Sequence, residues 1–373
     1  MNSPRDKTYT GEVVYNYAYD IAYEMGREPI RELLGQPLAE FSIDSTKRNP
    51  RHLFFFRPQM ARLPPSERLG PYGPMRVETV VKLLPVGVVS ITVRVPFSVA
   101  SINDLVVFHD LQFSNGSLNE EVRRLAEKVR AELAPRLIRA VPMLVDEEAY
   151  TIFCIESPVR DERNGPMPAE RWLEQHRREV AALLTQEPDV NDLSDQEATE
   201  STSRFLSYYG TDLVVVDWDA ALIVDEPQDF HETLYVMELA NLQLAELEAY
   251  DRILDDALER SYRDLRARPT KRRVNMLADL REIRIDLARF SDELSNITKF
   301  FGDWHLARIY DNISARFHLN DWHRTVNEKL KTLDGLYQLL KQDQTNRLML
   351  ILETIIVILF VLDLVILAIG LRK

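Results

Sequence analysis

A nearly uninterrupted apolar run close to the C-terminus constrains this chain most strongly. Residues 348–371 contain 18 Leu, Ile, Val or Phe residues in 24 positions. A helix of that length reaches about 36 Å, which exceeds the ~30 Å hydrocarbon core of a bilayer. The run therefore predicts one C-terminal transmembrane helix, and we assign residues 347–373 to a membrane anchor.

Two carboxylates, Glu353 and Asp363, interrupt the apolar run. On an insertion scale the apolar residues contribute about −5 to −11 kcal/mol, and the two acids together cost roughly 5 to 7 kcal/mol. Insertion of an isolated helix is therefore marginal, and a partner helix would relieve the cost. We expect these intramembrane acids either to hydrogen-bond between helices of an oligomer when protonated, or to line an ion path.

The charges that flank the run favour one orientation. Two cations, Arg372 and Lys373, follow the run, whereas four closely precede it: Lys329, Lys331, Lys341 and Arg347. An excess of cations on the N-terminal side favours a cytoplasmic N-terminal part. The single cysteine, Cys154, cannot form an intramolecular disulfide, which agrees with a reducing compartment. We therefore expect a single-pass membrane protein with its N-terminal domain in the cytoplasm.

Proline and charge divide the chain at the same point. All 19 prolines lie at or before Pro269. Residues 270–373 carry 16 basic and 13 acidic side chains, a net charge of +3, so the remainder of a chain with net charge −13 carries −16. Such an acidic part does not attract nucleic acid or anionic lipid through its overall charge. We predict four segments: an irregular N-terminal segment (1–75), a mixed α/β head (76–226), a helical stalk (227–346) and the anchor.

Residue patterns in the head predict strands and helices without a regular βαβ alternation, hence an α+β fold. Two hairpins are expected, from β-branched runs at 79–84 and 88–95 and at 213–216 and 220–224. The first helix should begin at Ser117, which has Glu120 three residues on, a capping-box pattern. The other expected elements are a buried strand at 149–155, a helix at 168–184 and a solvated connection at 189–200. Before residue 76, the candidates are a helix near 21–34 and a strand at 52–57.

The stalk has the clearest helical periodicity in the chain. Residues 227–267 are expected to form a helix with one broad apolar face, the first seam. A second seam, again a row of apolar residues along one face of a helix, follows at alternating spacings of four and three, which is typical of a coiled coil. Its members are Met276, Leu280, Ile283, Leu287, Phe290, Leu294, Ile297 and Phe301. A third seam comprises Val326, Leu330, Leu333, Tyr337 and Leu340. The seams can pair within one chain or between chains, and a homo-oligomer is expected if they pair between chains.

Three C-terminal segments carry a resemblance to a known family. They are residues 238–251 (ELANLQLAELEAYD), 327–330 (NEKL) and 352–357 (LETIIV). In this order they resemble the "required for meiotic nuclear division" family, proteins of bacteria, yeast and mitochondria with a domain of unknown function. The resemblance covers mainly residues 210–371. It implies a membrane-attached, self-associating protein, with support of organellar translation as the role of mitochondrial members. No transit peptide is recognisable, so a bacterial inner membrane is the expected location.

A basic cluster between the first two stalk helices is the main candidate for ligand contact. Its members are Arg260, Arg263, Arg266, Arg268, Lys271, Arg272 and Arg273. Clustered cations suit anionic phospholipid head groups or RNA phosphates. Because Tyr262 is the one aromatic residue among them, base stacking has little support and nucleic acid is the less favoured partner. The alternative interpretation of the basic cluster is a solvent-exposed turn between two helices, without a ligand.

No arrangement of residues in the sequence indicates catalysis, a cofactor or a metal site. His305, His318 and His323 follow no ligand spacing typical of zinc, and Asp303 and Asp321 are better explained as helix caps. We expect a membrane-anchored oligomeric scaffold or tether that binds membrane lipid. The alternatives are an oligomeric channel or transport component that uses Glu353 and Asp363, and a membrane-attached factor associated with RNA or translation.

Overall fold

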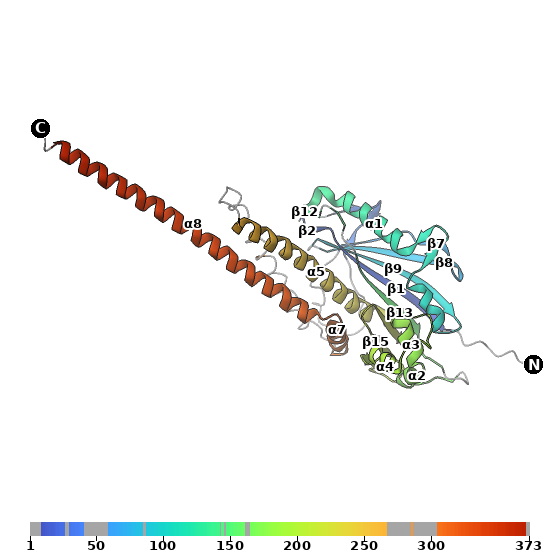
Figure 1. Cartoon of the computed structure of the whole chain (residues 1–373). Coiled ribbons are helices and arrows are strands. Elements are labelled where there is room, and N and C mark those ends of the chain that lie inside the picture. Colours follow the sequence, from blue (N-terminus) through green and yellow to red (C-terminus); the bar gives the residue numbers. More distant parts are fainter. Residues whose placement is uncertain are drawn as a thin grey trace, which may run out of the picture. The chain divides into compact units, whose positions relative to one another are not determined.

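A computed structural model describes residues 9–26, 30–40, 59–84, 87–141, 143–144, 147–160, 165–266, 285 and 304–370. The chain forms two compact units, one made of Met1–Ala249 and Glu293–Trp322, the other of Tyr250–Asp292 and His323–Lys373. The described residues show a mixed sheet with helices, followed by C-terminal helices, which confirms the predicted α+β class (Figure 1).

One large sheet dominates the first unit. Its strands follow the order β14-β15-β16-β13-β1-β9-β8-β6-β5, and β7 also pairs with β8. The bounds are β14 Phe205–Leu206, β15 Leu213–Val216, β16 Ala220–Asp225, β13 Glu148–Glu156, β1 Tyr9–Asp20, β9 Val88–Val99, β8 Gly73–Leu83, β6 Gln59–Arg62, β5 Ala39–Glu40 and β7 Ser66–Gly70. The sheet is mixed because β13 and β16 run parallel, whereas its other described pairs are antiparallel.

Small strand pairs and helices complete the described elements. The pairs are β2 Ala22–Met25 with β12 Leu137–Ala140, β3 Glu32–Leu33 with β4 Gln36–Pro37, and β10 Gln112–Phe113 with β11 Gly116–Ser117. The helices are α1 Leu118–Leu133, α2 Ala169–Gln175, α3 Arg177–Leu184, α4 Asp195–Ser201, α5 Phe230–Arg266, α7 Trp304–Arg316 and α8 Leu319–Gly370, with short 3-10 turns at Asn103–Phe108 and Ala134–Arg136.

The alternation of side chains along the strands divides the sheet into two faces. On β1, Tyr15, Tyr17 and Tyr19 belong to the main core, into which α1, α2 and α3 also place apolar side chains. The residues between them face the other way, and Ala18 packs against Leu239 and Leu242 of α5. Successive strand residues point to opposite faces, and on β8 and β9 the face towards α5 carries polar residues such as Lys82, Ser90 and Thr92. Figure 1 shows α1 and α5 on opposite sides of the central strands.

Several elements confirm the predictions from sequence. Both hairpins form, β8–β9 and β15–β16, and the strand β13 and the helix α5 lie where expected. The Ser117 hydroxyl accepts a hydrogen bond from the Glu120 amide at 3.2 Å, which caps α1. The helix expected at 168–184 is divided at His176 into α2 and α3.

The prediction for the N-terminal segment was wrong. Where we expected irregular chain, β1 forms the centre of the sheet between β9 and β13, and β2, rather than a helix, follows it. A run rich in tyrosine and valine suits a strand buried on both faces, a pattern without the polar alternation that marks a half-buried strand. The connection expected at 189–200 contains α4, and the candidate strand at 52–57 lies outside the described residues.

The second unit shows how one of the predicted seams is used. Lys329 of α8 lies 2.6 Å from Asp251 and 2.7 Å from Asp255 of α5, so the two helices meet within one chain. In the third seam, Val326 and Leu333 are buried at 2% and 1% exposure. Their burial shows that this seam already has partners inside the protomer. The eight residues of the second seam, from Met276 to Phe301, lie outside the described residues.

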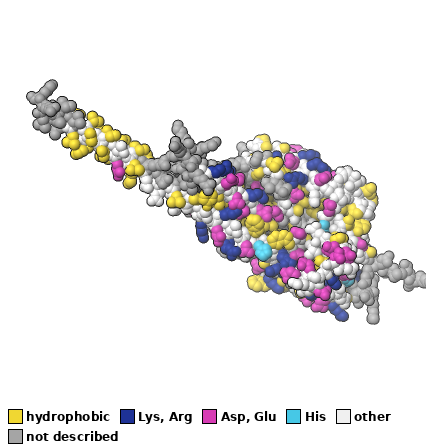
Figure 2. Space-filling view, in the orientation of Figure 1, with side chains coloured by type: hydrophobic (Ala, Val, Ile, Leu, Met, Phe, Trp, Pro, Cys, Tyr) yellow, Lys and Arg dark blue, Asp and Glu magenta, His cyan; other side chains and the backbone are white. Residues whose placement is uncertain are grey.

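The predicted transmembrane helix is not confirmed. In the described part of the chain, no helix is long and apolar enough to cross a membrane. The apolar run instead forms the distal part of α8, where the described side chains are exposed. Figure 2 shows hydrophobic side chains along this end of the helix.

Candidate functional site

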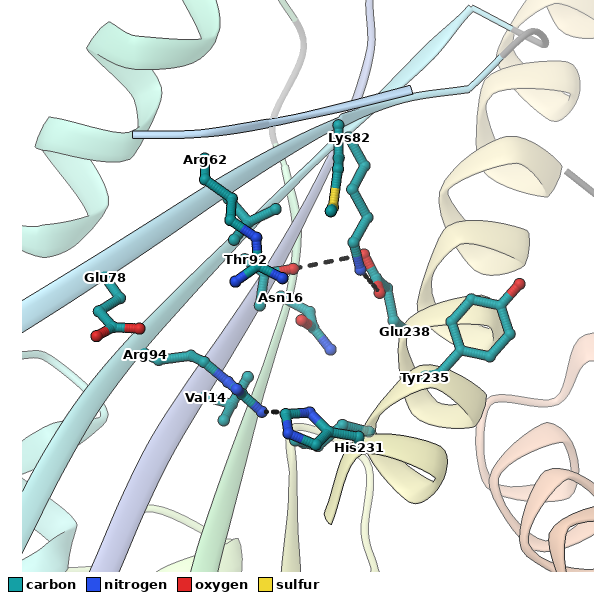
Figure 3. Close-up of a pocket in the computed structure, with 13 residues that line it drawn as sticks. Val14, Asn16, Arg62, Glu78, Lys82, Thr92, Arg94, His231, Tyr235 and Glu238 are labelled. Atoms are coloured by element: carbon teal, nitrogen blue, oxygen red, sulfur yellow. Dashed lines mark hydrogen bonds and ion pairs between the residues drawn. The ribbon is translucent and has the colours of Figure 1, made fainter. Parts of the chain in front are cut away.

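A cavity of 260 Å³ opens between the sheet and the first turns of α5, within the first unit (Figure 3). Its walls come from β1, β6, β8, β9 and α5. The lining residues are Val14, Asn16, Met60, Arg62, Glu78, Val80, Lys82, Thr92, Arg94, His231, Leu234, Tyr235 and Glu238. Every strand contributes alternate residues, as expected if a single face of the sheet forms the floor.

A buried carboxylate, Glu238, closes one end of the cavity. It is 4% exposed and forms an ion pair with Lys82 of β8. Ser90 donates a hydrogen bond to the same carboxylate at 2.5 Å, and Thr92 donates one at 3.4 Å. Figure 3 shows Lys82 and Thr92 directed at Glu238. These bonds connect α5 to β8 and β9, so they hold the helix over the floor of the cavity.

At the other end of the cavity, Arg94 contacts both Glu12 and His231. Its guanidinium lies 3.2 Å from the Glu12 carboxylate and 3.4 Å from Nδ1 of His231. The pKa of His231 is lowered by burial and by the neighbouring positive charges of Arg94 and Arg62. The neutral imidazole is therefore favoured, and Nδ1 can accept the hydrogen bond from Arg94. Burial also raises the pKa of Glu12, although Arg94 opposes the shift.

Two polar groups of the lining have no protein partner among the described residues. Asn16 is 2% exposed, and its side-chain Nδ2 makes no hydrogen bond there. The Arg62 side chain forms neither an ion pair nor a hydrogen bond within that part of the chain. A buried amide donor without an acceptor costs free energy, so its presence beside a cavity calls for an explanation.

The site residues predicted from sequence lie elsewhere. Glu353 and Asp363 are both exposed on α8. In the basic cluster, Arg260 lies 3.6 Å from Asp256 and Arg263 lies 3.3 Å from Glu259, each an i, i+4 pair along α5. Acidic side chains of the same helix thus compensate part of the positive charge of these two arginines. Of the remaining cations, the Arg266 side chain and the residues Arg268, Lys271, Arg272 and Arg273 lie outside the described part.

His305, His318 and His323 are the histidines whose spacing raised the question of a metal site. No group of three or more His, Cys, Asp or Glu side chains able to hold a metal is present among the described residues. His318 lies 3.4 Å from Asp321 and packs against Trp218.

Comparison with known proteins corrects the resemblance drawn from the sequence. The family described as "Uncharacterized protein MJ0711, N-terminal domain" matches residues 10–231, which run from β1 into the first turn of α5. The uncharacterized protein MJ0711 of Methanocaldococcus jannaschii is 24% identical over 219 residues. The alignment covers 58% of this chain and 65% of that protein, slightly less than two thirds of the relative's length.

No solved structure matches the chain. The resemblance to the "required for meiotic nuclear division" family is wrong, because the match found lies over the sheet rather than over the C-terminal helices. Apart from Tyr9, the matched residues contain the whole described sheet, and with it the four strands that line the cavity. The chain therefore belongs to the MJ0711 N-terminal domain family.

Proposed function

We propose that this chain is a membrane-attached scaffold. Lipid covers the distal part of α8, and this helix holds residues 10–231, the family domain, at the membrane. One observation carries the proposal. Every large apolar residue described between positions 348 and 366 is between 47% and 66% exposed. Contiguous apolar surface of this extent marks an interaction site, since soluble monomers rarely leave it in water.

The distribution of these residues favours lipid over a protein partner. Five consecutive positions, 348–352, and eight more, 355–362, are apolar and exposed, so the apolar surface surrounds the helix. A partner helix covers one stripe of about a third of the circumference, whereas a helix that is apolar all round suits a surrounding apolar medium. The cations that closely precede the run outnumber those that follow it, and this excess favours the cytoplasmic side for the family domain.

Self-association is a second part of the proposal. Glu353 and Asp363 lie within the apolar surface, and a carboxyl group surrounded by lipid gains from a hydrogen-bonding partner on another helix. Pairing of α8 helices from two copies would supply that partner. The basic cluster adds less support for anionic lipid, because Arg260 and Arg263 already have acidic neighbours on their own helix.

Flotation with lipid vesicles tests the proposal. The full chain should float with phosphatidylcholine vesicles after reconstitution, and the variant Ile356→Lys/Phe360→Lys should lose most of that association. Each lysine at the centre of an apolar helix costs roughly 2.5–3.5 kcal/mol, so the pair should reduce partitioning by more than about a thousandfold.

Met143→Lys is the matched control. Met143 is an exposed apolar residue of the family domain, with 72% exposure, and its replacement should leave flotation unchanged. Equal flotation of the parent and the double-lysine variant would contradict attachment through α8.

A further inference from the structure

The cavity under α5 has features of a ligand site that the membrane proposal does not use. It combines charged side chains at its rim with apolar side chains on its walls, among them Val14, Val80 and Leu234. Its volume of 260 Å³ lies just below the ~300 Å³ at which sites for drug-sized ligands begin, so it suits a smaller molecule.

The ion pairs around the cavity leave one positive charge uncompensated. Lys82 is paired with Glu238, Arg94 with Glu12, and Glu78 with Arg76 at 2.7 Å. Since His231 favours its neutral form, Arg62 is the cation of the lining that lacks an ionic partner in the described part of the chain. This charge balance fits a ligand with a single negative charge better than a dianion such as phosphate.

The hydrogen-bonding groups independently indicate an acceptor on the ligand. The buried Nδ2 of Asn16 is a donor that has no acceptor among the described residues. In Figure 3, Asn16, Arg62 and Arg94 border the same space on the strand side of the cavity. A planar carboxylate offers two acceptor oxygens, which match an amide N–H together with a guanidinium.

We propose that this cavity binds a small monocarboxylic acid, with its carboxylate at Arg62 and Asn16 and its apolar body against Val14, Val80 and Leu234. Ligand binding satisfies the buried amide of Asn16 and neutralises the charge of Arg62. The wall groups are held in place by the Glu238 and Arg94 networks, so the site is formed before the ligand arrives.

Binding of hexanoate to the full chain tests this assignment. Calorimetric titration should show one site, and hexanamide, which has the same size without the charge, should bind at least about tenfold more weakly. The same reduction is expected for hexanoate with Arg62→Gln, because a hydrogen bond to a charged group contributes about 1.5–3 kcal/mol. Arg62→Lys should restore part of the affinity.

Arg124→Gln provides the matched control. Arg124 is an exposed arginine of α1, on the opposite side of the sheet, and its loss should leave hexanoate binding unchanged. Arg62 is itself exposed, so Arg62→Gln should fold normally, and thermal unfolding without ligand checks this. Equal affinity for hexanoate and hexanamide, tighter binding of inorganic phosphate than of hexanoate, or no binding at all would overturn the proposal.

Discussion

Replacement of Glu238 by alanine should lower the free energy of unfolding by about 3–5 kcal/mol, because it removes the buried carboxylate that forms an ion pair with Lys82 and leaves that charge buried. Lys82 is 8% exposed and Glu238 is 4% exposed, so water cannot readily replace the lost carboxylate. Ser90 also loses the acceptor that lies 2.5 Å from its hydroxyl. Chemical denaturation followed by tryptophan fluorescence measures the change.

The double variant Lys82→Met/Glu238→Leu separates the loss of a partner from the loss of the pair. Removal of both charges takes away the cost of burying them, so this variant should recover most of the stability lost by Glu238→Ala. If the double variant were as unstable as Glu238→Ala, the loss of stability would come from the missing ion pair and not from the Lys82 charge that Glu238→Ala leaves buried.

Gly11→Ala should be the second most damaging change, with a loss of about 3 kcal/mol. A Cβ atom at this position would lie 1.9 Å from the Cys154 carbonyl oxygen and 2.9 Å from the carbonyl carbon. These are backbone atoms of β13, the strand that pairs with β1, so no side-chain rotation can relieve the overlap. The two central strands must separate locally, and overpacking of this kind costs about 1–3 kcal/mol or more.

Gly210→Ala is the control for that change. A Cβ atom added there meets nothing within 4 Å, so the free energy of unfolding should stay within about 0.5 kcal/mol of the parent. The same denaturation experiment measures both variants. A Gly11→Ala protein as stable as Gly210→Ala would show that β1 and β13 are not as closely paired as described.

The parts of the fold that could be predicted from sequence are those with local signals. The β8–β9 hairpin follows from β-branched runs on either side of a short turn, and α1 follows from the Ser117 cap and the spacing of its apolar residues. The central position of β1 could not be predicted in this way. Its partners are β9 and β13, which lie far along the chain, and no local pattern specifies such pairing.

The cavity was missed for the same reason. Lys82 and Glu238 are separated by 156 residues, and their pairing depends on the way α5 crosses the sheet. A weaker signal was present in the sequence: Glu78, Val80 and Lys82 alternate with apolar residues of the core on β8. Such alternation indicates a second, more polar face, but not which helix covers it.

The proposed contact between α8 and lipid can be tested most directly by spin labels on that helix. Cys154 is fully buried, so single labels can be placed without a competing surface thiol. Ile351→Cys, Ile358→Cys and Leu362→Cys place them on the side of α8 away from Glu353 and Asp363, the side that lipid should cover even when two α8 helices pair. We predict that, in vesicles, labels at all three positions collide readily with oxygen, which concentrates in lipid, and rarely with a water-soluble nickel chelate. High collision rates with the chelate would place this end of α8 in water, and low rates with both reagents would place it against protein; either result would contradict attachment through lipid.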